Sequence, residues 1–355
     1  MNITVVTASM GAGGAERVIA QLLKEWCANG VECTLITLNK APIFYPLPKQ
    51  VEVLEIGVLS KKHYIDKLKK YVQVRKLIRK IKPDIVLALP EEIGIYVIGA
   101  LLGMNVPVVV SERNNPWKMP YKKASRIVRK LMYPFAEGFI FQTSFAASFF
   151  PESIQRRGIV LKNPLDLARI PNPYEGTREK IIVGAGRLEP QKNFKLLIDA
   201  FSLFYKKHSN YKLVIYGEGT MRNELETYAA VRIPQDAYAF PGNVSNLLDR
   251  INSCSAFVLS SDYEGMPNVL IEAMAMGVPC VSTDCPSGGP KELIKDGING
   301  FLVEVGDRDT LVQRLDTLVS GVGIYSEAQQ IKEHFNSKRI ANQWLAYLKS
   351  VINRG

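Results

Sequence analysis

Two glutamates stand eight residues apart around the start of an apolar segment. Glu264 lies in Tyr263–Pro267 (YEGMP). Glu272 lies within Val269–Met276, where all the remaining residues are apolar. A helix that is apolar on all sides is normally buried, and a buried carboxylate must be paired or hydrogen-bonded. A protein cation or donors on a ligand would satisfy Glu272 equally well.

The turn that carries Glu264 has the composition of an anion site at a helix start. Gly265 frees the backbone, and Pro267 suits the first helical position, where no N–H group is needed. The amides after Gly265, at Met266 and Asn268, would then face a bound anion.

A second turn, Gly186–Asn193 (GRLEPQKN), carries two cations five residues apart. Arg187 and Lys192 lie on either side of Pro190 and can point at one anion at a helix start. Arginine offers a planar fork and lysine a point charge, which together suit a diphosphate. Two solvated loop cations are the alternative.

A third turn, Met10–Arg17 (MGAGGAER), is rich in glycine and opens a helix. Gly13 and Gly14 would let the backbone approach an anion closely. A dinucleotide fingerprint would need glycine where Glu16 stands, and the second strand ends at Leu38–Lys40 without an acidic residue for a ribose. Both features argue against an NAD-dependent oxidoreductase.

The elements that must position these turns are short apolar strands alternating with helix-length segments, typical of parallel sheets covered on both faces. A proline-rich linker at Asn163–Glu179 divides two such series, which predicts two doubly wound α/β domains. All three turns fall at carboxyl ends of strands, where such sheets bind ligands. The first-half strands are expected at Ile3–Thr7, Cys33–Thr37, Asp84–Ala88, Val106–Ser111, Gly138–Gln142 and Ile159–Leu161. The second-half strands are expected to start near Ile181, Leu213, Ala256, Cys280 and Gly300.

The composition is that of an ordinary soluble globular protein, with 355 residues of which 47% are hydrophobic and 22% charged. Five cysteines form no CxxC pair, which favours free thiols in a reducing cytoplasm. The first residues show no signal peptide. The uncharged stretch Ile93–Ser111 contains three glycines and a proline, so it indicates a buried helix, a turn and a strand rather than a membrane span.

The excess positive charge lies in the first half of the chain. Through Leu165 there are 24 Lys and Arg against 12 Asp and Glu, and the remainder has 21 against 22. Much of the excess lies in two runs, Lys61–Lys82 and Lys118–Phe135. The first run indicates either a solvated outer helix or a surface attracted to anionic lipid. No nucleic-acid-binding motif accompanies the charge. The apolar face expected for this helix is Ile65, Leu68, Val72, Ile78 and Ile81.

The order and spacing of five motifs resemble the retaining glycosyltransferases of family GT4. The resemblance covers nearly the whole chain and is strongest over Ile181–Val305. It implies the GT-B fold, an α/β architecture of two Rossmann-like domains facing across a cleft. The motifs are GGAER (Gly13–Arg17), GRLEPQKN (Gly186–Asn193), GEG (Gly217, Glu218 and Gly219), EGMPNVLIEAMAMGVPCV (Glu264–Val281) and GGPKELIKDGINGFLV (Gly288–Val303).

The family implies three parts of the chain with different tasks. Residues 1–165 would form an acceptor-binding, membrane-facing domain, and residues 166–336 would bind the nucleotide sugar. Residues 337–355 would form a helix packing back on the first domain.

The resemblance also implies roles for single residues. Arg187 and Lys192 would neutralise the donor diphosphate, helped by the Gly13–Gly14 loop and the amides after Gly265. Glu272 would hold the ribose hydroxyls, and Glu264 would contact the donor sugar near the reacting carbon. The backbone around Val244 would meet the base. The nucleotide sugar is a substrate, and neither a cofactor nor an obligatory metal is implied.

Two features depart from the family pattern. Many members place a histidine after the fourth strand, where this chain has SERNNP, so Glu112 and Arg113 become the site candidates at this position. One D-x-D motif, Asp307–Asp309, is better explained as helix capping than as a metal site.

The expected activity is transfer of a UDP-activated hexose or N-acetylhexosamine to a polyprenyl-diphosphate-linked oligosaccharide, in the assembly of surface glycans such as O-antigen. The enzyme would be cytoplasmic and peripherally bound to the anionic inner face of the membrane. The alternatives are a GT-B nucleotide-sugar epimerase and a non-enzymatic basic membrane-binding module.

Overall fold

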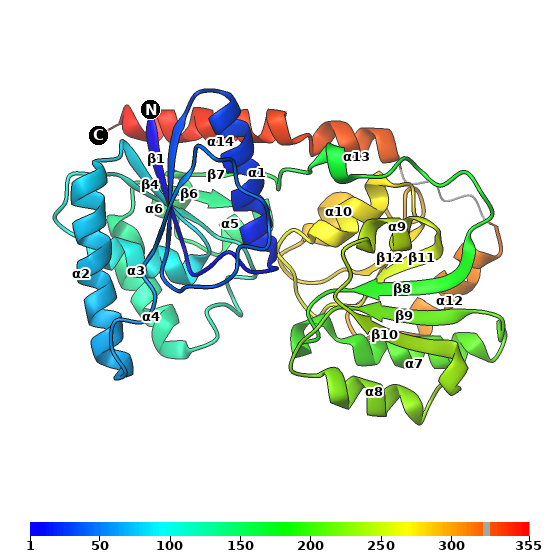
Figure 1. The fold of residues 1–355 in the computed structure, drawn as a ribbon. Helices are drawn as coiled ribbons and strands as arrows, with labels where there is room; N and C mark the ends of the chain where they lie inside the picture. Colours follow the sequence, from blue (N-terminus) through cyan, green and yellow to red (C-terminus); the bar gives the residue numbers. More distant parts are fainter. Residues whose placement is uncertain (322–326, 355) are drawn as a thin grey trace. The chain divides into compact units, whose positions relative to one another are not determined.

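The computed structural model describes residues 1–321 and 327–354 (Figure 1). It divides the chain into two compact units. The first consists of Met1–Pro164 with Phe335–Gly355, and the second of Leu165–His334.

The first unit is built on seven parallel strands in the order β3-β2-β1-β4-β5-β6-β7. The order reverses beside β1, which pairs with both β2 and β4. Side chains alternate along β1, so that Ile3 and Val5 enter one core and Val6 enters the other. The strands are β1 (Asn2–Thr7), β2 (Glu32–Thr37), β3 (Glu52–Glu55), β4 (Ile85–Ala88), β5 (Val108–Ser111), β6 (Gly138–Phe141) and β7 (Gly158–Val160).

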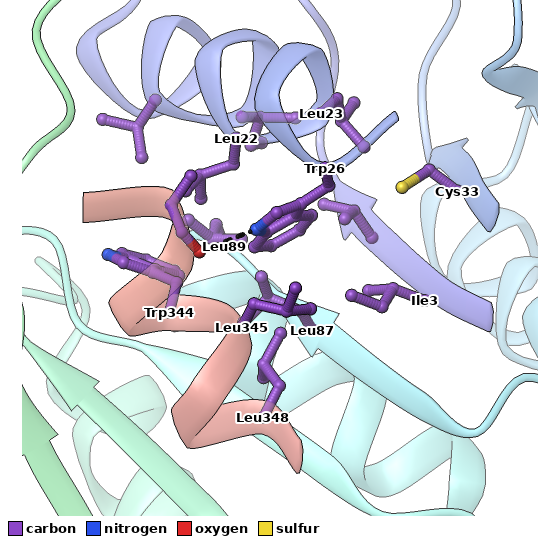
Figure 2. Packing of buried hydrophobic residues seen from close by; sticks show 14 of the residues in the cluster. Ile3, Leu22, Leu23, Trp26, Cys33, Leu87, Leu89, Trp344, Leu345 and Leu348 are labelled. Atoms are coloured by element: carbon purple, nitrogen blue, oxygen red, sulfur yellow. Dashed lines mark hydrogen bonds between the residues drawn. The ribbon is translucent and has the colours of Figure 1, made fainter. Parts of the chain in front are cut away.

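Helices cover both faces of this sheet. One core lies under α1 (Gly14–Ala28) and α14 (Ser337–Ile352), and the other under α2 (His63–Ile81) and α3 (Glu91–Leu101). Figure 2 shows Trp26 of α1 and Trp344 of α14 among the apolar side chains of the first core. The indole N–H of Trp26 donates to the Ala341 carbonyl at 3.0 Å. The remaining helices are α4 (Lys123–Met132), η1 (Tyr133–Phe135), α5 (Ser144–Ser148) and α6 (Glu152–Gln155).

The second unit repeats this plan with six parallel strands in the order β10-β9-β8-β11-β12-β13. Its reversal point lies between β8 and β11. Helices α7, α8 and α12 pack over one face, and Figure 1 shows α9 and α10 over the other. The strands are β8 (Glu179–Ala185), β9 (Lys212–Tyr216), β10 (Tyr238–Gly242), β11 (Cys254–Leu259), β12 (Cys280–Thr283) and β13 (Phe301–Val303). The helices are η2 (Leu167–Arg169), η3 (Pro190–Lys192), α7 (Phe194–Tyr205), α8 (Arg222–Ala230), η4 (Gln235–Ala237), α9 (Leu247–Asn252), α10 (Asn268–Ala275), α11 (Gly289–Leu293), α12 (Arg308–Val319) and α13 (Ala328–His334).

The predicted fold class, two doubly wound α/β sheets, is confirmed. Every strand predicted from the sequence is present, and Ile93–Ser111 spans most of α3, a turn and β5. The five cysteines are free thiols. Among the described residues, none of the helices combines the length and apolarity needed to span a bilayer.

The face predicted for the helix in Lys61–Lys82 is wrong in part. The expected Ile65, Leu68 and Val72 are exposed, and α2 instead buries Lys70 and Val74, together with the expected Ile78. Lys70 can turn inward because its ammonium group meets the Asn39 amide oxygen at 2.8 Å and the Asp66 carboxylate at 3.1 Å.

Candidate functional site

The central feature of the second unit is a buried ion pair at its reversal point. Lys192 ends η3 after β8, and Glu264 lies between β11 and α10. Their Nζ and Oε1 atoms are 2.5 Å apart, with side-chain exposures of 15% and 8%. The Ser261 hydroxyl donates to the same carboxylate oxygen at 2.6 Å. A carboxylate and an ammonium group are therefore held where doubly wound sheets bind ligands.

Hydrogen bonds between the two loops fix this pair. The Gln191 side-chain amide donates to the Tyr263 carbonyl at 2.8 Å, and the Asp262 N–H donates to the Gln191 carbonyl at 2.9 Å. Asn193 adopts a left-handed conformation, with φ of 43°, and caps α7 by accepting from the Leu196 N–H. Its amide also donates to Asp262 Oδ1 at 2.7 Å.

Glycines let the neighbouring loops pack backbone to backbone. Gly217 has φ of +132°, and a Cβ there would lie 1.9 Å from the Gly186 carbonyl oxygen. A Cβ at Gly219 would lie 2.4 Å from the Leu188 oxygen. Between them, Glu218 pairs with Arg222 at 2.5 Å. These contacts hold the GEG motif against the loop that carries Lys192.

Other predicted residues of the second unit lie in loops at the same edge of the sheet. Val244 is half-buried in the loop after β10. The last residue of β10, Gly242, accepts a hydrogen bond at 3.0 Å from the Gly217 N–H of the GEG motif. Arg187 is exposed in the loop after β8.

The turn before α10 differs slightly from the prediction. Pro267 is the N-cap residue rather than the first helical residue, because its ψ of 102° is extended and α10 begins at Asn268. Gly265 and Met266 are buried, Asn268 is half-buried, and Glu272 is buried one turn into α10. A Cβ on Gly289 would lie 1.8 Å from the Gly265 oxygen, so the loop after β12 supports this turn.

In the first unit, the predicted glycine turn caps a helix. Gly13 is the N-cap residue of α1, with Gly14 as the first helical residue. The Glu16 carboxylate folds over this turn, since a Cβ on Gly13 would lie 2.0 Å from Glu16 Oε2.

Glu112 is buried among protein groups after β5. It accepts a hydrogen bond from the Tyr133 hydroxyl and lies 3.8 Å from an Arg129 nitrogen. Burial, with the nearby Glu91 carboxylate, raises the pKa of Glu112 to about 8. Glu112 therefore links the loop after β5 to Tyr133 and Arg129.

Arg113 follows Glu112 in the same loop and has its own set of partners. Its N–H donates to Glu91 at 3.3 Å, and its guanidinium donates to the Asn163 amide oxygen at 2.5 Å. The guanidinium also lies 5.8 Å from the centre of the Trp344 ring. Burial lowers the pKa of Arg113 to about 10.

The Asp307–Asp309 motif is a helix cap. Asp307 Oδ1 accepts from the Thr310 N–H at 3.0 Å, which starts α12. The capping interpretation is thus confirmed.

Sequence reasoning missed the residues that hold the candidates in place. These are Ser261 beside Glu264, and Arg129, Tyr133 and Glu91 beside Glu112. Ser261 was within reach of a sequence argument, because it ends the predicted run AFVLSS that begins at Ala256. The partners of Glu112 come from separate helices, so only the tertiary fold brings them together.

Comparisons with known proteins identify the class. A model described as glycosyl transferases group 1 matches residues 170–334, and one described as glycosyltransferase family 4 matches residues 12–169. The chain therefore contains both of these glycosyltransferase domains, as the motifs indicated.

Among curated relatives, a Campylobacter jejuni enzyme is 28% identical over 99% of both chains. It is named GalNAc-alpha-(1->4)-GalNAc-alpha-(1->3)-diNAcBac-PP-undecaprenol alpha-1,4-N-acetyl-D-galactosaminyltransferase. The lipopolysaccharide 1,6-galactosyltransferase of Escherichia coli is 28% identical over 76% of this chain and 73% of its own.

Solved structures support the GT-B fold. Anabaena HepE, solved in complex with UDP and glucose, superposes with a TM-score of 0.83 at 17% identity, covering 98% of this chain and 99% of that one. The lipopolysaccharide outer core galactosyltransferase WaaB superposes with a TM-score of 0.76 at 22% identity, covering 99% of both.

Proposed function

We propose that this glycosyltransferase moves a hexose or N-acetylhexosamine from a nucleotide sugar to a polyprenyl-diphosphate-linked oligosaccharide. The proposed donor is a UDP-sugar. The transfer retains the anomeric configuration and serves surface-glycan assembly. The observation that carries the proposal is the buried Lys192–Glu264 pair at the reversal point of the second sheet. The two glycosyltransferase domain matches and the Campylobacter relative's name support the reaction and its lipid-linked acceptor.

The proposed division of labour follows the chemistry of the leaving group. The diphosphate gains negative charge as the glycosidic bond breaks, so cations and backbone amides aimed at it stabilise the transition state. Lys192 and Arg187 supply the cations, and the turn from Gly265 to Asn268 supplies amides. Glu264 contacts the donor sugar near the reacting carbon.

The remaining donor contacts come from neighbouring loops. Glu272 accepts from the ribose hydroxyls, and the backbone near Val244 meets the base. The GEG loop, Gly217–Gly219, lies against the loop after β8 that carries Lys192 and completes the donor site there. In the first unit, the Gly13–Gly14 turn and Arg113 supply further polar groups.

The acceptor assignment also rests on charge. The basic runs Lys61–Lys82 and Lys118–Phe135 lie in the unit proposed to bind the acceptor. Anionic lipid head groups and acceptor phosphates both attract such a surface, by roughly 1 kcal/mol per basic side chain near a membrane. We therefore place the enzyme at the cytoplasmic face of the inner membrane.

A panel of nucleotide sugars tests the proposal. We expect one UDP-sugar to raise the melting temperature and to be consumed only when a polyprenyl-diphosphate glycan is present. Proton NMR of the product would show the donor's anomeric configuration. Conversion of the nucleotide sugar without any acceptor would instead identify an epimerase. Vesicle binding without transfer, unchanged when Arg187, Lys192, Glu264 and Glu272 are replaced by alanine, would identify a membrane-binding module.

A further inference from the structure

Helix α4 turns its apolar side outward. Ile127 is 64% exposed, Leu131 is 60% exposed, and Phe135 just beyond the helix is 55% exposed. Their spacing of four residues places them on one helical face. The side that faces the protein carries a charged residue, Arg129, which is only 3% exposed, beside the half-buried Met132. This is the reverse of the pattern expected for a surface helix.

Specific contacts fix this orientation. The Arg129 guanidinium donates to the Pro116 carbonyl at 2.8 Å and to the Met119 carbonyl at 2.9 Å. It also lies 4.8 Å from the centre of the Phe149 ring and 3.8 Å from Glu112. Turning α4 over would remove the contacts of this guanidinium with the two carbonyls, the Phe149 ring and Glu112, so these contacts keep the apolar face outward.

The surroundings of this face carry one sign of charge. The 24 residues from Arg113 to Ala136 include seven lysines and arginines and no aspartate or glutamate. Lys122, Lys123 and Lys130 are exposed beside the apolar stripe. Two exposed aromatic residues, Trp117 and Tyr121, stand in the segment just before α4.

We propose that α4 is an interfacial helix whose apolar face, Ile127, Leu131 and Phe135, inserts below the head groups of an anionic bilayer. This inference rests on the membrane association proposed above and specifies its physical basis. The charge favours lipid over a protein partner, because a second copy of this face would meet equally positive charge. Apolar side chains flanked by lysines and aromatic rings are typical of helices that lie in the membrane interface.

Insertion predicts binding that salt does not abolish. At about 1 M salt the Debye length is about 3 Å, so attraction between surface charges is largely screened while apolar burial is not. The test is sedimentation of the full-length protein with vesicles of phosphatidylglycerol and phosphatidylethanolamine at low and at high salt. We expect a substantial bound fraction in both.

The fluorescence of Trp117 can report how deeply this part of the protein enters the bilayer. Trp26 and Trp344 are fully buried, whereas Trp117 is 40% exposed and its carbonyl accepts from Arg126 of α4. We expect its fluorescence to shift to shorter wavelength on vesicle binding and to be quenched by lipids brominated near the top of the acyl chain.

The decisive variant is Ile127→Ser with Leu131→Ser, which should lower high-salt vesicle binding at least about tenfold at an unchanged melting temperature. The matched control is Val231→Ser with Ile298→Ser, two exposed side chains of the second unit, which should leave binding unchanged. Transfer to a short-chain, water-soluble acceptor should also be unchanged, so that failure of catalysis and failure of insertion are separate results.

Two outcomes would overturn the inference. Vesicle binding that disappears at high salt and is insensitive to the double substitution would mean attraction by charge alone. Concentration-dependent self-association that the double substitution removes, without lipid binding, would mean that this face pairs with a second copy.

Discussion

The ammonium group of Lys192 and the carboxylate of Glu264 meet at 2.5 Å although 72 residues separate them in the chain. Both side chains are largely withdrawn from water, so each depends on the other for neutralisation. Lys192→Met should therefore lower the free energy of unfolding of the second unit by about 3 kcal/mol. Guanidinium denaturation would measure this, and adding Glu264→Gln should recover part of the loss. Equal stability of Lys192→Met and the parent would contradict the pairing.

Glu264 and Arg187 should differ in their kinetic effects. Glu264→Gln keeps the shape but removes the negative charge that we propose lies near the reacting carbon, so turnover should fall at least about 100-fold. Arg187→Ala removes an exposed cation and should mainly raise KM for the donor. Steady-state kinetics with the identified donor would separate the two. Near-normal turnover in both variants would refute the site assignment.

Gly289 should not tolerate a side chain. A Cβ there would lie 1.8 Å from the Gly265 oxygen, so Gly289→Ala must push apart the turn before α10 and the loop after β12. We expect donor affinity, measured by calorimetry, to fall at least about tenfold. Gly11→Ala is the control, because a Cβ on Gly11 meets nothing within 4 Å.

Trp344 should be central to the stability of the first unit. It is fully buried beside Trp26 and Leu348 (Figure 2). Trp344→Ala should cost about 3–5 kcal/mol in denaturant unfolding, because it leaves a large cavity. Gln343→Ala, on the exposed side of the same helix, should change stability by less than about 0.5 kcal/mol.

Glu112 should make stability depend on pH. Burial raises its folded-state pKa to about 8 from 4.5, within a cluster containing Glu91, Arg113, Arg129 and Tyr133. Between these values the folded state holds a proton that the unfolded state has lost, so stability falls as pH rises through this window.

Replacing Glu112 with glutamine removes that titration. The stability of the parent relative to Glu112→Gln should fall by up to about 1.4 kcal/mol per pH unit between pH 5 and 8, and level off above. Thermal unfolding of both proteins across this range would measure the difference. Parallel pH profiles would contradict the raised pKa.

Much of the fold was predictable because the pattern is local. Runs such as Ile3–Thr7 and Val106–Ser111 are apolar at most positions, and the intervening segments have helical length, so the doubly wound class follows. The two missed strands have weak signals. In β3, glutamates stand at Glu52 and Glu55, and β10 contains Pro241, which a strand tolerates at the edge of a sheet.

The burial of a side chain was predictable only where it depends on residues nearby in the sequence, and not where it depends on residues distant in the chain. The burial of Glu272 followed from its apolar surroundings in sequence. The inward turn of Lys70 depends on Asn39, and that of Arg129 on Glu112 and two carbonyls, all distant in the chain. The motifs that begin at Gly186 and Glu264 could each be recognised in the sequence. The ion pair between Lys192 and Glu264 forms only because β8 and β11 are neighbours in the sheet.

The last helix has a consequence for how the protein is made. The first unit contains its core residue Trp26 near the amino terminus, yet Trp26 donates to Ala341, 315 residues later. A ribosome delivers the whole second unit before it delivers that partner. The amino-terminal sheet must therefore wait, with one face covered by α1 alone, until α14 has been synthesised, so the half that is synthesised first is completed last.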